Sequence, residues 1–391
     1  MGTAVTTKIV RNQMNQRELS ELRRRWRPEK NAVSRIYGCF VNSGGELVSD
    51  LEEPLGMLPQ EEVEQYLGLL KKTMSGTLGK NLIDIVFSTQ QVMDSEEHRL
   101  LMNLRDSELQ DGEIRRNFYQ KVIGSLDMDG RPYVLLLAHD TYDVPHKGGD
   151  GEFQQDASDE VFSYIVCAVC PVKLGKVELN YFPGDNEFHC TARQTVMAPE
   201  LGFVFPAFDD RSANIYDALF YSQKSGELHQ EFIDAVFHID PPMSAAEQKE
   251  AFQTALSEAL EDAYSFGVAQ AIHEHLSGKL EQHKECKIPE PLTISVGEMK
   301  NTLRECGVPE ERITAFEQRC SEQFGSGTVL YPENILDAGR FEIKTAQAAV
   351  RINPEYSHLA QARMIDGKKY ILIPIEEGIE VNGLAVTAPD Q

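Results

Sequence analysis

Histidines and acidic residues gather in the middle of the chain, where their types could support metal or acid–base chemistry. His139 and Asp140 end the apolar run that starts at Tyr133, and His146 follows soon after. Imidazole nitrogens and carboxylate oxygens are ligands for divalent metals and act as general acids and bases. Their spacing matches no named motif. Two interpretations stay open for residues 139–160: a solvated acidic loop, or a metal or catalytic site.

A second candidate is the tetrapeptide Asp209-Asp210-Arg211-Ser212, which we expect between a strand and a helix. Asp210 or Ser212 could cap that helix, since acidic and hydroxyl side chains favour helix N-termini. Paired carboxylates beside an arginine could instead do acid–base or metal chemistry. A metal-dependent hydrolase or nuclease would draw on His139, Asp140, His146, Asp209, Asp210 and Arg211.

Basic residues gather only at the N-terminus. Residues 1–30 hold eight Lys/Arg and three Asp/Glu, a net charge of +5. Met14–Trp26 reads as a helix with an apolar stripe of Leu19, Leu22 and Trp26. This helix could dock on the protein's own surface, or it could form an arm that contacts nucleic-acid phosphates. The candidate phosphate contacts are Arg23, Arg24, Arg25, Arg27, Lys30 and Arg35.

The composition narrows the function classes. The formal net charge is −24, so the acidic body repels phosphate backbones and any nucleic-acid contact must be local. The longest apolar runs are too short to cross a bilayer, which takes about 20 residues. The sequence lacks G-x-G-x-x-G, P-loop, G-x-S-x-G and H-E-x-x-H motifs. We therefore predict no cofactor, no metal and no membrane partner.

The seven cysteines are irregularly spaced, which argues against a disulfide framework and for a reducing cytoplasm. Cys167 and Cys170 form a C-x-x-C pair inside an apolar strand. Residues three apart in a strand face opposite sides of the sheet. We therefore expect both to be structural.

The order of elements predicts an α+β protein. We expect a mixed, mainly antiparallel sheet with flanking helices, a helical middle section and a C-terminal β region. The predicted divisions are a basic helical arm over 1–30, an α+β core domain over 31–240, a helical section over 241–326 and a β region over 327–391.

Two segments resemble an uncharacterised domain family found in anaerobic Gram-positive bacteria. They are RPEKNAVSRIYGCFVN (27–42) and PELGFVFPAFDDRSANIYDALFY (199–221). From Phe208 onward the chain also resembles, more distantly, the bacterial nucleoid-associated protein family. The matching segments there include AAEQKEAFQTALSEAL and PLTISVGEMKNTL. This second resemblance implies association with DNA.

Three functional hypotheses follow. The first is a non-enzymatic, nucleoid-associated-like cytoplasmic protein that contacts DNA through its basic arm. The second is a scaffold that forms homo-oligomers and carries no chemistry. The third is the metal-dependent hydrolase or nuclease.

Overall fold

The computed structural model describes residues 14–147, 153–240, 242–325, 329–337, 339–375, 378–381 and 384–386, without the side chains of 146–147, 153–159, 329 and 381. The chain divides into two compact units. The first comprises Met1–Ser244 with Pro289–Pro291, and the second comprises Ala245–Ile288 with Leu292–Gln391. The predicted arm and core domain thus lie in one unit, and the predicted helical and C-terminal β sections lie in the other.

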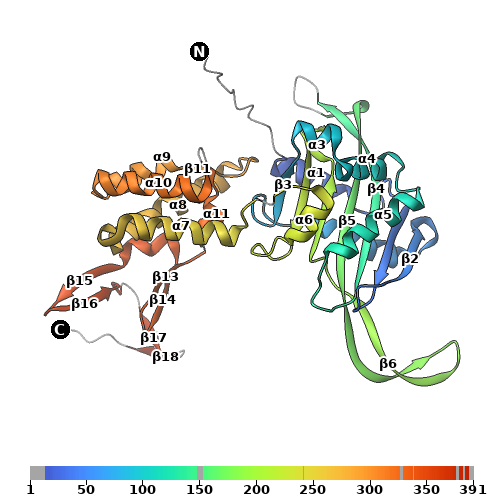
Figure 1. Cartoon of the computed structure of the whole chain (residues 1–391). Coiled ribbons are helices and arrows are strands. Elements are labelled where there is room, and N and C mark those ends of the chain that lie inside the picture. The colour runs from blue at the N-terminus through green and yellow to red at the C-terminus, as the bar shows by residue number, and fades with distance from the viewer. Residues whose placement is uncertain are drawn as a thin grey trace, which may run out of the picture. The chain divides into compact units, whose positions relative to one another are not determined.

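The first unit is built on an eight-stranded sheet in the order β2-β1-β4-β5-β7-β10-β3, with β6 paired to β5 (Figure 1). Its named strand pairs are antiparallel, so the α+β class and the mainly antiparallel sheet are confirmed. The strands are β1 (Arg35–Val41), β2 (Leu47–Pro54), β3 (Leu82–Val86), β4 (Tyr133–Lys147), β5 (Phe153–Phe182), β6 (Glu187–Val196), β7 (Leu201–Phe205) and β10 (Asp217–Ser222).

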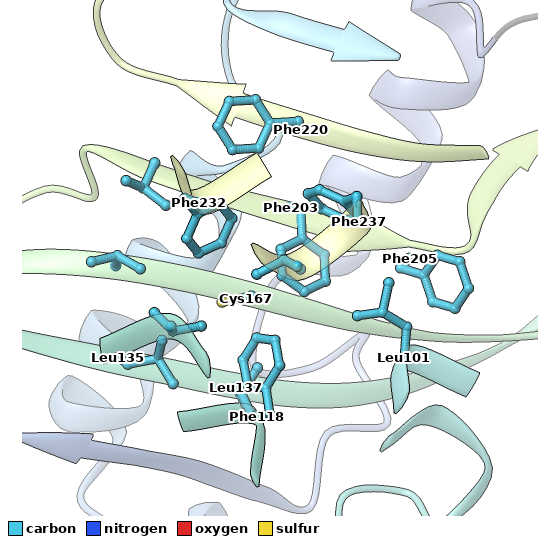
Figure 2. Packing of buried hydrophobic residues seen from close by; sticks show 14 of the residues in the cluster. Leu101, Phe118, Leu135, Leu137, Cys167, Phe203, Phe205, Phe220, Phe232 and Phe237 are labelled. Atoms are coloured by element: carbon cyan, nitrogen blue, oxygen red, sulfur yellow. The ribbon is translucent and has the colours of Figure 1, made fainter. Parts of the chain in front are cut away.

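Helices cover both faces of this sheet. They are α1 (Gln16–Arg25), η1 (Leu55–Met57), α2 (Gln60–Lys72), α3 (Thr89–Asp94), α4 (Glu96–Asp106), α5 (Gly112–Ser125) and α6 (Gln230–Phe237). On one face, side chains of α4, α5 and α6 form an aromatic-rich core with the strands (Figure 2). There Phe203 meets Phe237 with ring centroids 5.3 Å apart. On the other face, α1 and α2 pack on the alternate residues of the same strands.

The two faces account for the C-x-x-C pair. Cys167 belongs to the core under α4–α6, and Cys170 belongs to the core under α1 and α2. Both are buried in β5 and neither forms a disulfide. The prediction of two structural cysteines on opposite faces is confirmed.

The prediction of an acidic loop is wrong for residues 139–147 and 153–160, and residues 148–152 lie outside the described residues. β4 continues to Lys147 and β5 begins at Phe153, and the two pair through Thr141↔Ser163 and Asp143↔Val161. Tyr142 and Val144 are buried, so the segment alternates apolar-in and polar-out like a half-buried strand. Asp143 is the exposed member between Tyr142 and Val144, whereas Asp140 is buried like Tyr142 and Val144.

The predicted helix after Asp210 is also wrong. β8 (Ala207–Asp209) and β9 (Ser212–Asn214) form a hairpin closed by Asp210 and Arg211. Both turn residues have positive φ, 48° and 60°, as a two-residue type I′ turn requires. β10 then follows and is buried at every residue. A strand buried on both faces shows no alternation, so its apolar run can be mistaken for a helix.

The second unit has a helical core and small β elements. Its elements are α7 (Ala245–Leu260), η2 (Glu261–Ala263), α8 (Phe266–Cys286), β11 (Ile294–Ser295), α9 (Val296–Glu305), α10 (Glu310–Phe324), β12 (Val329–Leu330), α11 (Pro332–Ile335), β13 (Phe341–Lys344), β14 (Ala349–Ile352), η3 (Pro354–Leu359), β15 (Gln361–Ile365), β16 (Lys368–Leu372), β17 (Ile379–Val381) and β18 (Leu384–Val386). Helices α7 to α10 enclose the core, and β13 to β18 pair as three hairpins. The predicted helical section and C-terminal β region are confirmed. Within the described residues, no helix has the length and apolarity to cross a membrane.

Candidate nucleic-acid interface and neighbouring polar sites

The basic helix α1 starts at a capping box. The Asn15 side chain accepts a hydrogen bond from the N–H of Glu18 (3.1 Å), and the Glu18 carboxylate accepts one from the N–H of Asn15 (2.8 Å). The predicted apolar stripe is buried against the sheet: Leu19, Leu22 and Trp26. The arm is therefore a docked helix of the first unit.

A buried polar network fastens this helix to the sheet. The Asp140 carboxylate is fully buried and accepts hydrogen bonds from the Tyr164 hydroxyl (2.6 Å) and the Ala32 N–H (2.8 Å). The Arg25 guanidinium lies 3.4 Å from the same carboxylate. Trp26 Nε1 donates to the Tyr164 hydroxyl at 3.1 Å. Burial and the Asp140 charge raise the pKa of Tyr164 well above its usual value, so the phenol remains a donor.

A second ion pair fixes the other side of the helix. Glu21 and Arg211 are 2.7 Å apart, and Arg211 also donates to the Pro145 carbonyl at 2.9 Å. The Tyr142 hydroxyl donates to Glu21 at 2.5 Å. The Arg25 guanidinium lies over the Tyr142 ring, 4.3 Å from its centroid. Arg211, a candidate for chemistry, therefore joins the β8–β9 turn to α1.

Two of the six predicted phosphate contacts already hold carboxylates. Arg25 pairs with Asp140 and keeps only 18% of its side chain exposed. Arg35 lies on β1 and forms an ion pair with Glu52 of the neighbouring strand β2. Both cations serve the fold of the first unit.

The other four predicted contacts form a basic surface with a lysine that the sequence did not single out. Arg23, Arg24, Arg27 and Lys30 have no ion-pair partner among the described residues, and neither does Lys71 of α2. Burial lowers the pKa of Lys71, and the nearby charges of Arg27 and Arg23 lower it further. Lys71 is thus close to both arginines. We call these five residues the basic surface.

His139 and Asp140 do not act together. They are adjacent in β4 and point to opposite faces, and His139 Nε2 lies 2.8 Å from Ser163 Oγ. Burial lowers the pKa of His139. His139 lines a cavity of about 450 Å³ together with Arg35, Tyr37, Glu108 and other polar residues. The residues that line the cavity come from strands of the sheet and from the loop between α4 and α5. These segments are far apart in the sequence, so no local pattern predicts that they meet.

Asp209 belongs to a separate acidic group near the β8–β9 hairpin. Asn214 Nδ2 donates to Asp209 (3.2 Å) and to Asp217 (2.6 Å). Burial raises the pKa of Asp209. Burial, followed by the Asp217 and Asp209 charges, raises the pKa of Asp84 on β3 to about 7. Asp84 and Asp217 were not sequence candidates, because each stands alone in an apolar strand.

The hydrolase candidates are therefore spread over different places. Asp140 pairs with Arg25 of α1, Asp209 lies in the acidic group, and the His146 side chain lies outside the described residues. Across the described part of the chain, no three His, Cys, Asp or Glu side chains are placed to hold a metal ion.

Comparison with known proteins identifies the family of this chain, but it assigns no activity to it. Neither the curated proteins nor the solved structures contain a match to this chain. A family model does match residues 14–384, which include the docked helix, the sheet and most of the second unit. The chain belongs to DUF4317, a family whose description is "domain of unknown function".

Proposed function

We propose that this chain is a cytoplasmic, DNA-associated protein that contacts phosphates through the basic surface. The observation that supports this is that Lys71 lies near enough to Arg27 and Arg23 for their charges to help lower its pKa, while the three cations form no ion pair with a carboxylate among the described residues. The chain has 62 Asp and Glu residues, so partners of opposite charge are abundant in its composition. A polyanion would relieve the mutual repulsion of these cations.

Part of the basic cluster has an ordinary structural role. Arg23, Arg24 and Arg25 lie in the last turn of α1, where cations interact favourably with the helix dipole. Lys71 lies in the last turn of α2 and has the same role there, whereas Lys30 lies beyond α1 and has no such role. The helix dipoles therefore account neither for Lys30 nor for the proximity of Lys71 to Arg23 and Arg27. Because the chain distantly resembles the nucleoid-associated family, we infer that the polyanion is DNA.

The acidic body sets the character of the binding. A net charge of −24 opposes the approach of DNA, and five local contacts must overcome it. Each neutralised phosphate releases condensed counterions, so five contacts give a log–log salt slope of about −4 to −5. We expect binding that is weak at physiological salt and rises steeply as salt falls. Phosphate contacts carry no base information, so sequence preference should be small.

The test is fluorescence anisotropy of labelled double-stranded DNA across a salt series. A variant with Arg23, Arg27 and Lys71 changed to Gln should bind more weakly, and its salt slope should fall by about 3. A matched control changes Lys249, Lys284 and Lys287 to Gln. Both variants shift the net charge from −24 to −27, but the control residues lie in the second unit.

The two variants separate a local contact from a charge effect. If the basic surface meets DNA, the control should keep the native slope. If both variants lose DNA affinity equally, the loss is caused by the change in net charge and not by a contact at the basic surface. No binding by the native chain even at low salt would refute the proposal.

A further inference from the structure

The cavity beside His139 lies where the apolar core of the sheet ends. Side chains along β4 alternate between the face under α4–α6 and the face under α1 and α2. Leu135 and Leu137 belong to the core under α4–α6 (Figure 2). The next two positions on that face are His139 and Thr141, and both line the cavity. This face of β4 therefore changes from apolar to polar at His139.

Neighbouring strands continue the polar row that begins at His139. The antiparallel register of β1 with β4 brings Arg35 beside His139 on the same face. The register of β1 with β2 brings Glu52 to this face as well. On the other side of β4, Ser163 of β5 lies with its Oγ 2.8 Å from His139 Nε2. Four strands thus place polar side chains in one row across the end of the sheet.

The loop between α4 and α5 borders the cavity above this row. Glu108 and Leu109 have positive φ, 52° and 60°, which is unfavourable for residues other than glycine. The loop is held in this conformation because Leu109 is fully buried and its carbonyl accepts a hydrogen bond from Arg115. Gln110 Nε2 donates to the Glu108 carboxylate at 3.2 Å. The fold therefore fixes Glu108 and Gln110 at the cavity.

The cavity presents charges of both signs. Arg35 and Glu52 form an ion pair in which 47% of each side chain remains exposed. A guanidinium has five N–H donors, so this pair leaves donors of Arg35 for a ligand. Glu108 forms no ion pair among the described residues. A ligand that matches both groups carries an anionic group for Arg35 and a cationic group for Glu108.

His139 adds an uncharged hydrogen-bonding group. Burial lowers the pKa of His139, while the nearby charges of Glu108 and Asp140 act in the opposite direction. The imidazole is therefore mainly neutral at pH 7, with one nitrogen as a donor and the other as an acceptor. Nε2 lies against Ser163, and within the described residues Nδ1 makes no hydrogen bond. Nδ1 is thus available to a ligand.

The lining residues favour a small polar ligand over other classes. A purely anionic ligand would meet the two carboxylates, and a purely cationic ligand would meet Arg35. Ser34, Gln110 and Thr141 contribute uncharged polar side chains, which suit a ligand with further hydrogen-bonding groups. The volume of about 450 Å³ lies in the range of small-molecule sites.

We propose that this cavity binds a free α-amino acid with an uncharged polar side chain. The carboxylate of the amino acid binds Arg35 and His139, and its ammonium group binds Glu108. The cavity lies on the face of the sheet opposite to α1 and α2, so this binding is independent of DNA binding at the basic surface.

The first test is isothermal titration calorimetry of the full chain with L-glutamine, L-asparagine, L-serine and L-threonine, and with L-leucine as an apolar comparison. At least one of the four polar amino acids should bind at one site and more tightly than L-leucine. The N-acetyl derivative of that amino acid lacks the ammonium charge, and its C-terminal amide lacks the carboxylate. Each should bind about tenfold or more weakly, because each loses a charge-assisted hydrogen bond.

The second test repeats the titration with variants. Glu108→Gln and Arg35→Gln each remove one charge from the cavity and should weaken binding about tenfold or more. Asp106→Asn is the matched control for the carboxylate, since Asp106 ends α4. Arg116→Gln is the control for the cation, since Arg116 pairs with Asp50 of β2. Neither control residue lines the cavity, so both controls should keep the native affinity. Thermal unfolding checks that all four variants fold.

The proposal is overturned if none of the four polar amino acids binds at millimolar concentration, or if L-leucine binds as tightly as they do. An N-acetyl derivative or an amide that binds as tightly as its parent would also overturn it. The same holds if Glu108→Gln and Arg35→Gln keep the native affinity, or if the controls lose as much affinity as these variants.

Discussion

Removal of the Asp140 carboxylate should detach helix α1 from the sheet. Asp140 is fully buried and accepts from Tyr164, Ala32 and Arg25. Asp140→Ala leaves three donors without their acceptor, one of them a charged guanidinium. Loss of one partner of a buried ion pair costs about 3–5 kcal/mol. Arg25 keeps 18% exposure and can recruit water, so we expect a loss of about 3 kcal/mol.

Trp26 provides the assay, because it is the only tryptophan and belongs to the same network. Its ring is 2% exposed, so its emission should shift to longer wavelength when α1 detaches. Urea unfolding followed by Trp26 fluorescence reports on the first unit. The double change Arg25→Met with Asp140→Leu should be less damaging than Asp140→Ala, because an apolar pair leaves no buried charge.

The control is Asp143→Ala, which removes an exposed carboxylate from the same strand and should change stability by no more than about 0.5 kcal/mol. If Asp140→Ala costs less than about 1 kcal/mol and leaves the Trp26 emission unchanged, Asp140 does not anchor the helix.

Further predictions concern the sheet and its acidic group. Gly202→Ala should destabilise the first unit by about 3 kcal/mol or more, because a Cβ there would lie 2.3 Å from the Cys167 carbonyl oxygen; unchanged thermal unfolding would contradict this. Asp84 binds its proton more tightly in the folded protein, with a pKa raised from 3.8 to about 7. Its contribution to folding is therefore lost as pH rises from about 4 to about 7. Asp84→Asn should flatten that decline and make the protein more stable than the native chain at pH 8. Urea unfolding at several pH values checks both statements, and identical pH profiles would refute them.

Local patterns in the sequence correctly predicted the helix that carries the basic residues. The spacing of Leu19, Leu22 and Trp26 describes a helix with one buried stripe, and that stripe is buried. Strand alternation likewise placed Cys167 and Cys170 on opposite faces. These predictions succeeded because each depends on residues a few positions apart, where helix or strand geometry decides which side chains share a face.

The errors have equally physical causes. The acidic segment after His139 was read as a loop because its polar residues outnumber the buried Tyr142 and Val144 between them. The stretch after Asp210 was read as a helix because β10 is buried on both faces and shows no alternation. In both cases the pairing with a distant strand overrides the local composition.

The sequence by itself determined the α+β class, the overall acidity and the docking stripe of α1, since composition and short-range periodicity are properties of the chain alone. Only the tertiary structure decided how the basic residues are used. It assigns Arg25 to Asp140, over a hundred positions away, and brings Lys71 beside Arg23 and Arg27. It also points His139 and Asp140 to opposite faces of the sheet, and it leaves Val177 and Leu179 of the β5–β6 hairpin exposed. Partners far apart in sequence meet only when the sheet is assembled, because strand register and helix docking set those distances.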